Sequence, residues 1–427
     1  MNPVNAHTGS YIVSASWIIS PGKAPVAGGA MLVCDGRIAA VGELRRLRRD
    51  HNSLVVDYPG RAILPGFVNA HTHLELTHFH SWRLARQMED RPRSFVDWLV
   101  QLIKIRRSIK TKALFASACD GIRLCLESGT TSVGEIVTSR SLMKLYGVSP
   151  LSGRLFIELL GHDPTSFSGL LDEVLRSPQT TTCGAFKTGL SPHSAYTVSE
   201  ENMQLTADAM READLPVSVH CAESREETDF IFASEGKLAD TLYPLAGWER
   251  YLRSPLRCTP VELLDRVGLL TAGTLAVHCV HISRSDAELL RDKRVTVALC
   301  PRSNNFLDVG KPPVALLKKL GVPMVMGTDS LASNDSLSLW DEIRFTLQTF
   351  RNELSPAEVF RMSTLGGAEA LGLDSAQGSL EEGKRADFQI VRYSDEGSSD
   401  MLERIISQGS VEEVYVAGRR VVQNPYR

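Results

Sequence analysis

The sequence lacks the long apolar runs and the charge excess that mark several classes of protein. No run of about 18 apolar residues occurs in the 427-residue chain, so no membrane-spanning helix is predicted. Its 47 basic and 50 acidic side chains leave a formal charge of −3, which gives no general argument for a nucleic-acid partner. The chain has no Lys or Arg before Lys23 and makes a poor signal peptide. We therefore expect a cytoplasmic protein with neither a membrane nor a nucleic-acid partner.

Paired cysteines are also missing. The chain has 8 cysteines, and no two of them form a CxxC pair. This spacing disfavours a cysteine-based zinc site and a redox pair. Most of the cysteines lie in apolar runs, which is typical of reduced, buried thiols in a cytoplasmic protein.

Both ends of the chain have the pattern of short β-strands joined by tight turns. Near the start, the turn Asp35-Gly36 separates two apolar strands in the manner of a hairpin. Near the end, the turn Ala417-Gly418 separates another pair. We predict a small β-sandwich domain assembled from residues 1–62 and 376–427.

The middle of the chain alternates short apolar strands with longer amphipathic helices. This order predicts a parallel (β/α)8 TIM barrel over residues 63–375. A doubly wound open sheet is the alternative, although no GxGxxG follows the first strand, which disfavours a dinucleotide-binding version. The predicted strands are 62–68, 131–136, 154–160, 185–190, 217–220, 275–278, 296–299 and 324–326.

Histidines gather where chemistry is expected in such a barrel, at the C-terminal ends of the strands. The following lie at or just after a predicted strand end: His71, His73, His193, His220, His278 and His281. In His71-Thr72-His73 the two imidazoles point to the same side of an extended segment, which suits a metal clamp. The pair alone is equally compatible with a structural role.

Three further strand ends carry polar residues, each with an ordinary alternative. Glu223, three residues after His220, can shuttle protons or simply favour the start of a helix. His278 can belong to the site or be a hydrogen-bonded core residue. Asp329 can be a metal ligand, a general base or a turn former.

Considered together, these residues predict a metal site. Three histidines and one aspartate from strands one, five and eight would meet at one barrel mouth. Such a set suits Zn²⁺, or Fe²⁺ as the second choice, with water completing the shell. The metal would lower the pKa of that water from ~15.7 towards ~7.

Four segments in this order resemble the amidohydrolase superfamily, in its nucleobase and nucleoside deaminase branch, which also holds triazine chlorohydrolases. The segments are Pro65-Gly66-Phe67-Val68-Asn69-Ala70-His71-Thr72-His73, His220-Cys221-Ala222-Glu223, His278-Cys279-Val280-His281 and Gly327-Thr328-Asp329-Ser330. The resemblance implies one divalent metal held by His71, His73, His220 and Asp329. It also implies that Glu223 protonates a ring nitrogen, that His278 orients the attacking hydroxide and that His193 contacts the substrate.

The same resemblance bears on the number of metals and on the substrate. Binuclear relatives carry a carboxylated lysine at the end of strand four, whereas Lys187 lies too early in that strand to bridge a second metal. Residues 71–76, 300–310 and 328–334 are similar to those of aminodeoxyfutalosine deaminases, which serve menaquinone biosynthesis. This implies hydrolytic deamination of an adenine-type nucleoside, with 6-amino-6-deoxyfutalosine favoured. We expect substrate contacts, or structural roles, for Glu75, Trp98, Arg302 and Asn305.

Several alternatives stay open at this point. Within the branch they are methylthioadenosine/S-adenosylhomocysteine deaminase, guanine deaminase and triazine-type chlorohydrolase. A non-catalytic metal-binding barrel is disfavoured because binding alone needs neither Glu223 nor His278. A nucleic-acid deaminase is disfavoured because the HxE and PCxxC signature is absent. A homodimer is the assembly expected on general grounds.

Overall fold

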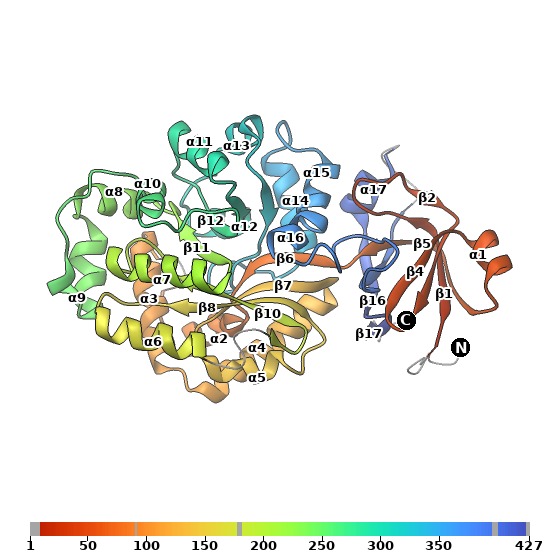
Figure 1. The fold of residues 1–427 in the computed structure, drawn as a ribbon, viewed down its shortest axis with the longest axis horizontal. Helices are drawn as coiled ribbons and strands as arrows, with labels where there is room; N and C mark the ends of the chain where they lie inside the picture. Colours follow the sequence, from red (N-terminus) through yellow and green to blue (C-terminus); the bar gives the residue numbers. More distant parts are fainter. Residues whose placement is uncertain (1–8, 90–91, 177–181, 395–399, 424–427) are drawn as a thin grey trace.

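The computed structural model describes residues 9–89, 92–176, 182–394 and 400–423. They form a barrel and a separate β-sheet at one end of the molecule (Figure 1). The strands of the separate sheet come from both ends of the chain. The predicted fold class, a parallel barrel with a β domain built from both termini, is therefore confirmed. The exact ranges 1–62, 376–427 and 63–375 stay a proposal, and their outer ends fall outside the described residues.

The barrel consists of eight parallel strands in the order β14-β13-β12-β11-β10-β8-β7-β6. A parallel bridge between Thr72 and Asp329 joins the end of β6 to the segment after β14 and closes the ring. The strands are β6 (Phe67–Thr72), β7 (Thr130–Val137), β8 (Ser152–Leu159), β10 (Phe186–Pro192), β11 (Val217–Cys221), β12 (Thr274–His278), β13 (Thr296–Leu299) and β14 (Met324–Met326); the short β9 (Thr182–Cys183) pairs antiparallel with β10. Most of their residues are buried, as in other parallel sheets covered by helices.

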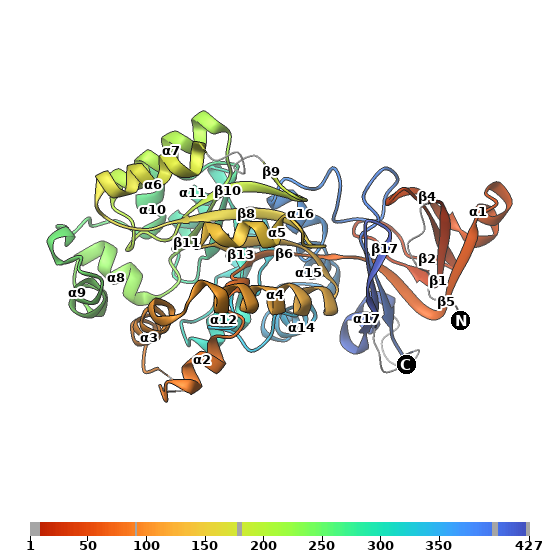
Figure 2. The same cartoon turned by 90° about the horizontal axis from the view of Figure 1, so that it is seen from below.

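Helices lie around these strands (Figure 2). They are α2 (Phe79–Ala85), α3 (Phe95–Ser108), α4 (Thr111–Glu127), α5 (Met143–Tyr146), α6 (Pro164–Arg176), α7 (Glu200–Ala213), α8 (Arg225–Ala233), α9 (Tyr243–Ala246), α10 (Pro260–Arg266), α11 (Arg284–Asp292), α12 (Pro301–Phe306), α13 (Val314–Leu320), α14 (Leu339–Thr349), α15 (Pro356–Met362) and α16 (Leu365–Ala370), with the short helical turns η1 (Leu74–Leu76), η2 (Arg140–Leu142), η4 (Leu238–Leu242) and η5 (Glu249–Tyr251). Local sequence sets their ends. At α7, for example, the Ser199 side chain accepts from the Asn202 N–H, and the chain turns left-handed at Asp214.

The terminal sheet has the strand order β17-β16-β15-β5-β1-β3-β4, with β2 paired to β1. Its strands are β1 (Tyr11–Ile18), β2 (Val26–Ala27), β3 (Gly29–Cys34), β4 (Arg37–Glu43), β5 (Leu54–Pro65), β15 (Phe388–Arg392), β16 (Ser410–Val416) and β17 (Arg419–Gln423); α1 (Leu44–Asp50) and α17 (Met401–Gln408) accompany them. The predicted hairpin at Asp35-Gly36 is present, and both residues have positive φ (49° and 77°), as a tight type I′ turn requires.

One predicted strand proves to be two. Residues 62–68 were expected to form the first barrel strand, but β5 continues to Pro65 in the terminal sheet, and β6 begins at Phe67 in the barrel. Gly66 lies at the junction, where a side chain would collide with Thr131. The run is apolar throughout because it is buried in both sheets, so the pattern alone did not show the change of sheet.

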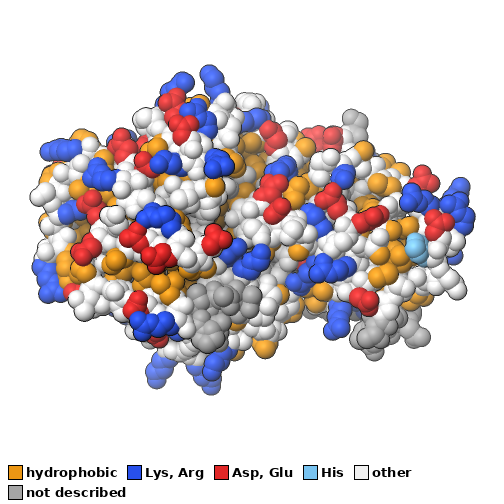
Figure 3. Space-filling model, viewed as in Figure 1, with side chains coloured by type: hydrophobic (Ala, Val, Ile, Leu, Met, Phe, Trp, Pro, Cys, Tyr) orange, Lys and Arg blue, Asp and Glu red, His pale blue; other side chains and the backbone are white. Residues whose placement is uncertain are grey.

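The surface charge, the helix lengths and the state of the cysteines agree with what the sequence predicts. Basic and acidic side chains are interspersed over the face drawn in Figure 3. Within the described ranges, no helix has both the length and the apolar character needed to cross a bilayer. All eight cysteines are free, and six of them are buried.

Candidate metal centre and active site

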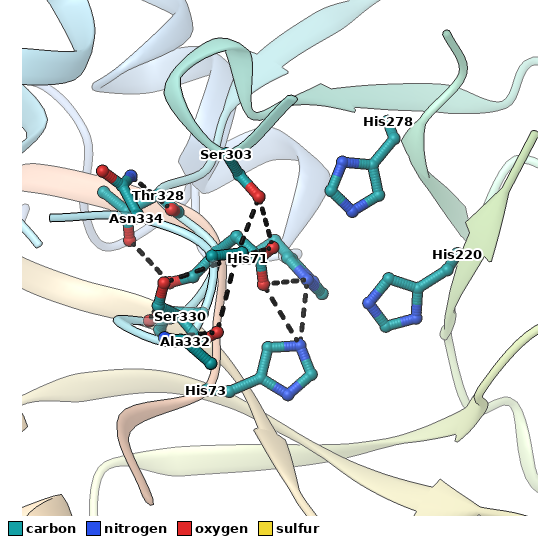
Figure 4. A network of polar contacts seen from close by, with 12 residues as sticks. His71, His73, His220, His278, Ser303, Thr328, Ser330, Ala332 and Asn334 are labelled. Atoms are coloured by element: carbon teal, nitrogen blue, oxygen red, sulfur yellow. Dashed lines mark hydrogen bonds and ion pairs between the residues drawn. The ribbon is translucent and has the colours of Figure 1, made fainter. Parts of the chain in front are cut away.

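His71 and His73 lie at the end of β6 and point to the same side of the chain (Figure 4). Their Nε2 atoms are 3.2 Å apart, which is the convergence that the strand period predicts. Both side chains are buried. Glu135 on β7 accepts from the Leu74 N–H at 3.0 Å, so the turn that follows His73 is held against the neighbouring strand.

Asp329 follows β14 and faces this pair. Its Oδ1 lies 3.7 Å from Nε2 of His71 and 3.5 Å from Nε2 of His73. Its Oδ2 accepts hydrogen bonds from Ser303 Oγ at 2.7 Å and Ser333 Oγ at 2.6 Å. The two hydroxyls therefore fix the carboxylate, and Oδ1 is left facing the histidines.

His220, at the end of β11, reaches the same point from another strand, and its ring centroid is 5.0 Å from that of His71. Its Nδ1–H donates to the main-chain oxygen of His193 at 2.9 Å. The hydrogen on Nδ1 leaves the Nε2 lone pair available as a ligand. His193, just after β10, is itself held at Nδ1 by Thr197 Oγ1 at 2.9 Å.

His278 and Glu223 occupy the remaining side of the cluster. His278 Nδ1 is 2.9 Å from Oδ1 of Asn304, and its Nε2 is 3.5 Å from Oε1 of Glu223. Glu223 is 4% exposed, and its N–H donates to Glu227 Oε2 at 2.8 Å. The backbone is strained at both places. Ala222, which precedes Glu223, has φ 49°, and His278 itself has φ 73°, so both adopt left-handed conformations.

Burial shapes the protonation of the cluster. Desolvation, together with the neighbouring imidazoles, lowers the pKa of His73 to about 3. Desolvation also lowers the pKa of His193 and of His278 to about 4. These rings are therefore neutral near pH 7 and can offer lone pairs. Burial, reinforced by the charge of Asp329, raises the pKa of Glu223 well above its ordinary value.

The arrangement fits a divalent metal. His71, His73 and Asp329 offer ligand atoms that all lie within 4.8 Å of one another, and so do His71, His220 and His278. Nε2 of His278 is buried and has no hydrogen-bond partner in the described part of the chain, although it faces the centre of the cluster (Figure 4). Buried polar atoms usually have partners, so this nitrogen indicates that something further binds at the centre. Neutral imidazoles with one carboxylate are typical ligands of such an ion.

A cavity of about 280 Å³ opens from the cluster. Two of the expected substrate contacts, Glu75 and Trp98, line it together with His193. Trp98 is fixed by a hydrogen bond from Nε1 to the Ala332 oxygen at 2.9 Å. Four residues of the cluster also line this cavity: His73, His220, Glu223 and Asp329.

Two expected contacts lie elsewhere. Arg302 Nε is 3.2 Å from Asn334 Oδ1 and 3.9 Å from Glu342 Oε2, and its Nη2 pairs with Asp335. Arg302 thus braces the loop after Asp329, because nearby carboxylates attract its guanidinium away from the cavity. Asn305 lines a separate cleft of about 830 Å³ beside Phe306 and His281, because α12 turns it away from the barrel axis. Neither residue lines the cavity beside the cluster, and a substrate contact for either one stays a prediction.

The cavity also contains residues that the sequence analysis missed. Glu158 lies on β8, and Arg106 and Arg107 lie on the last turns of α3. Glu158 stands near the end of a predicted strand, so the rule applied to the histidines, to Glu223 and to Asp329 would have found it if it had been extended to this strand. The arginines had no comparable signal, because the packing of α3 alone brings them to the cavity.

Comparisons with known proteins agree with this geometry. The sequence model of the amidohydrolase family matches residues 62–421. Aminodeoxyfutalosine deaminase of Deinococcus radiodurans is 29% identical over 357 residues, covering 81% of each chain. The 5'-deoxyadenosine deaminase of Methanothermobacter thermautotrophicus is 31% identical over 378 residues, covering 85% of this chain and 80% of the relative. The crystal structure of an adenosine deaminase from Xanthomonas campestris with bound zinc superposes with a TM-score of 0.76 at 24% identity, covering 97% of this chain and 93% of that one, which shows a shared fold.

Proposed function

The chain belongs to the amidohydrolase family and is a hydrolase of carbon–nitrogen bonds other than peptide bonds; from this premise we propose that it deaminates an adenine-type nucleoside, with 6-amino-6-deoxyfutalosine favoured. The observation that carries the proposal is the convergence of buried His71, His73, His220 and Asp329, the last three of which line one cavity together with Glu223. Relatives named as deaminases of adenine nucleosides support the same chemistry.

His71, His73, His220 and Asp329 would hold one divalent ion, with Zn²⁺ as the first choice and Fe²⁺ as the second. When bound, this ion supplies a Lewis acid that activates water near neutral pH. The protein's part is to keep the four side chains in place. Hydrogen bonds to the His193 oxygen, Ser303 and Ser333 do this for His220 and Asp329.

The neighbouring side chains would then move the protons. Glu223 donates a proton to N1 of the adenine ring, while Asp329 accepts a proton from the water that attacks C6. His278, held by Asn304, orients the oxygen as its bond to C6 forms. Asp329 then returns its proton to the amine, Glu223 accepts the remaining proton of the C6 hydroxyl, the C6–N bond breaks, and ammonia leaves.

The outer part of the cavity supports the favoured substrate. Its wall is largely apolar, with Phe95, Leu102, Ile103 and Trp248 among its members. Arg107 reaches the same wall and donates a hydrogen bond to the Leu245 main-chain oxygen at 3.1 Å; among the described residues it forms no ion pair with a carboxylate. An apolar wall next to such a cation suits a bulky 5'-substituent ending in an anion, as in 6-amino-6-deoxyfutalosine. A role in menaquinone biosynthesis would follow from that substrate.

The test is ammonia release by the zinc-loaded protein, compared by kcat/KM. The panel contains 6-amino-6-deoxyfutalosine, 5'-deoxyadenosine, methylthioadenosine, S-adenosylhomocysteine, adenosine, guanine and an aminotriazine. We expect the highest kcat/KM for 6-amino-6-deoxyfutalosine. A higher value for another adenine nucleoside would keep the chemistry and change the substrate. Turnover of guanine or the triazine alone would contradict the nucleoside proposal.

A further inference from the structure

Two carboxyl groups enter the cavity beside the metal cluster, and neither is used by the chemistry proposed above. Glu75 lies on η1, directly after the ligand pair of β6, and is 1% exposed. Glu158 is half-buried on β8. Both side chains line the cavity. They come from different strand ends, so the barrel alone brings them together.

Glu75 has one oxygen fixed and one oxygen free. Its Oε1 accepts from Arg106 Nε at 3.2 Å and also from Thr138 Oγ1. Arg106 Nη2 donates to the same hydroxyl at 2.8 Å, so the three side chains brace one another. The other carboxylate oxygen of Glu75, Oε2, is buried and has no hydrogen-bond partner among the described residues. A carboxylate oxygen in this position is costly unless a bound ligand donates to it.

Glu158 has even fewer contacts with the protein. Within the described ranges, its carboxyl group makes neither a hydrogen bond nor an ion pair. Burial, with the charge of Glu75 nearby, raises its pKa to about 8, whereas Arg106 acts in the opposite direction. Both carboxyl groups line the same cavity, so one bound ligand can contact both.

We propose that Glu75 and Glu158 together bind a vicinal diol, the 2'- and 3'-hydroxyls of the ribose of a nucleoside substrate. Hydroxyl groups can donate to both carboxyl groups and add no further charge to a buried site. Arg106 already compensates Glu75, so the pair does not require a cationic ligand. The inference rests on the proposed nucleoside function and deepens it, since it makes the sugar, and not only the base, a determinant of specificity.

The test measures binding of three ligands that the deamination reaction does not consume: inosine, 2'-deoxyinosine and 3'-deoxyinosine. Dissociation constants are determined by calorimetry for the zinc-loaded wild type, for Glu158→Leu and for the control Glu173→Gln. Glu173 lies in the adjoining surface cleft, is 67% exposed and pairs with Arg140. Because the Glu158 carboxyl has no protein partner, its removal leaves no buried group unpaired. Thermal unfolding checks that each variant is folded.

We expect wild type and Glu173→Gln to bind inosine about tenfold or more tightly than at least one deoxy form, because the missing hydroxyl leaves a carboxyl oxygen in the cavity without its hydrogen-bond donor. In Glu158→Leu this ratio should fall towards one. Equal binding of the three ligands by wild type, or an unchanged ratio in Glu158→Leu, would overturn the diol site.

Turnover separates this inference from the proposed function. The ratio of kcat/KM for adenosine over 2'- and 3'-deoxyadenosine should fall in Glu158→Leu as the binding ratio does. If no nucleoside is deaminated but inosine binding still depends on Glu158, the diol site stands and the deaminase proposal falls. If nucleosides are deaminated with a ratio that Glu158→Leu does not change, the diol site falls and the deaminase proposal stands. In Glu75→Gln, Arg106 would lose its charged partner, so this variant serves only as a second check if it folds.

Discussion

The imidazole of His220 donates through Nδ1 to the main-chain oxygen of His193, at 2.9 Å. The bond links the ends of β11 and β10, and it joins a proposed metal ligand to the residue proposed to contact the substrate. It selects the tautomer of His220 in which Nε2 carries the lone pair. It also places the two rings side by side, with centroids 4.7 Å apart. One hydrogen bond therefore couples the proposed metal centre to the cavity beside it.

Substitution Glu223→Gln should lower kcat by at least about 100-fold, because the glutamine amide cannot replace the carboxylic acid as a proton donor. Metal content should stay at the wild-type level, since Glu223 is not among the proposed ligands. Elemental analysis and ammonia release measure the two effects. Glu226→Gln is the matched control, because Glu226 lines the separate cleft. Turnover that survives in Glu223→Gln would show that another group supplies the proton.

His220→Ala should remove a ligand and lower the metal affinity. The loss should exceed the roughly 10- to 100-fold cost of removing a residue that only hydrogen-bonds to a ligand. Competition with a chromophoric chelator gives the affinity. His281→Ala should behave as wild type, because His281 is bonded to the Val309 oxygen at 2.7 Å and lies away from the cluster. If both variants bind zinc equally well, His220 is not a ligand.

Arg107→Met should lower kcat/KM about tenfold or more for nucleosides whose 5'-substituent ends in a carboxylate, the usual size of a lost charge-assisted hydrogen bond. Substrates with a neutral 5'-group, such as methylthioadenosine, should be affected little. The control is Lys104→Met, an exposed position on the same helix. An equal loss for charged and neutral substrates would indicate that Arg107 only supports the fold.

Glu342 should make stability depend on pH. Burial raises the pKa of this side chain from an ordinary 4.5 to about 8. The folded protein therefore keeps a proton that the unfolded chain loses above pH 4.5, so the free energy of unfolding falls as pH rises from 4.5 to 8. The slope is at most about 1.4 kcal/mol per pH unit for one group.

Glu342→Gln removes this contribution. Its free energy of unfolding should match that of wild type near pH 4.5 and exceed it above pH 8, whereas the exposed control Glu201→Gln should follow wild type throughout. Urea unfolding at several pH values, with zinc held constant, measures the difference. Parallel curves for wild type and Glu342→Gln would mean that Glu342 titrates normally.

Local sequence patterns were enough to predict the architecture and which strand-end residues lie near one another. Short apolar runs alternating with amphipathic helices are a local signal, and all eight predicted barrel strands overlap observed ones. The positions of the histidines could also be predicted, because a barrel brings the C-terminal ends of its strands to one mouth. His71, His73, His220 and Asp329 were predicted from strand position to meet at one barrel mouth, and their ligand atoms do lie near one another, although their role as metal ligands stays a prediction.

The surroundings of that centre depend on contacts between residues far apart in the sequence. A substrate contact or a structural role was expected for Arg302, and its guanidinium pairs with Asp335 and lies beside Asn334 outside the cavity, whereas Arg107 lines the cavity from the last turn of α3. The pairing of Glu75 with Glu158 joins residues far apart in the sequence. Strand and helix periods arise from neighbours along the chain, but the direction of a long polar side chain depends on which charges and cavities the folded chain places within its reach.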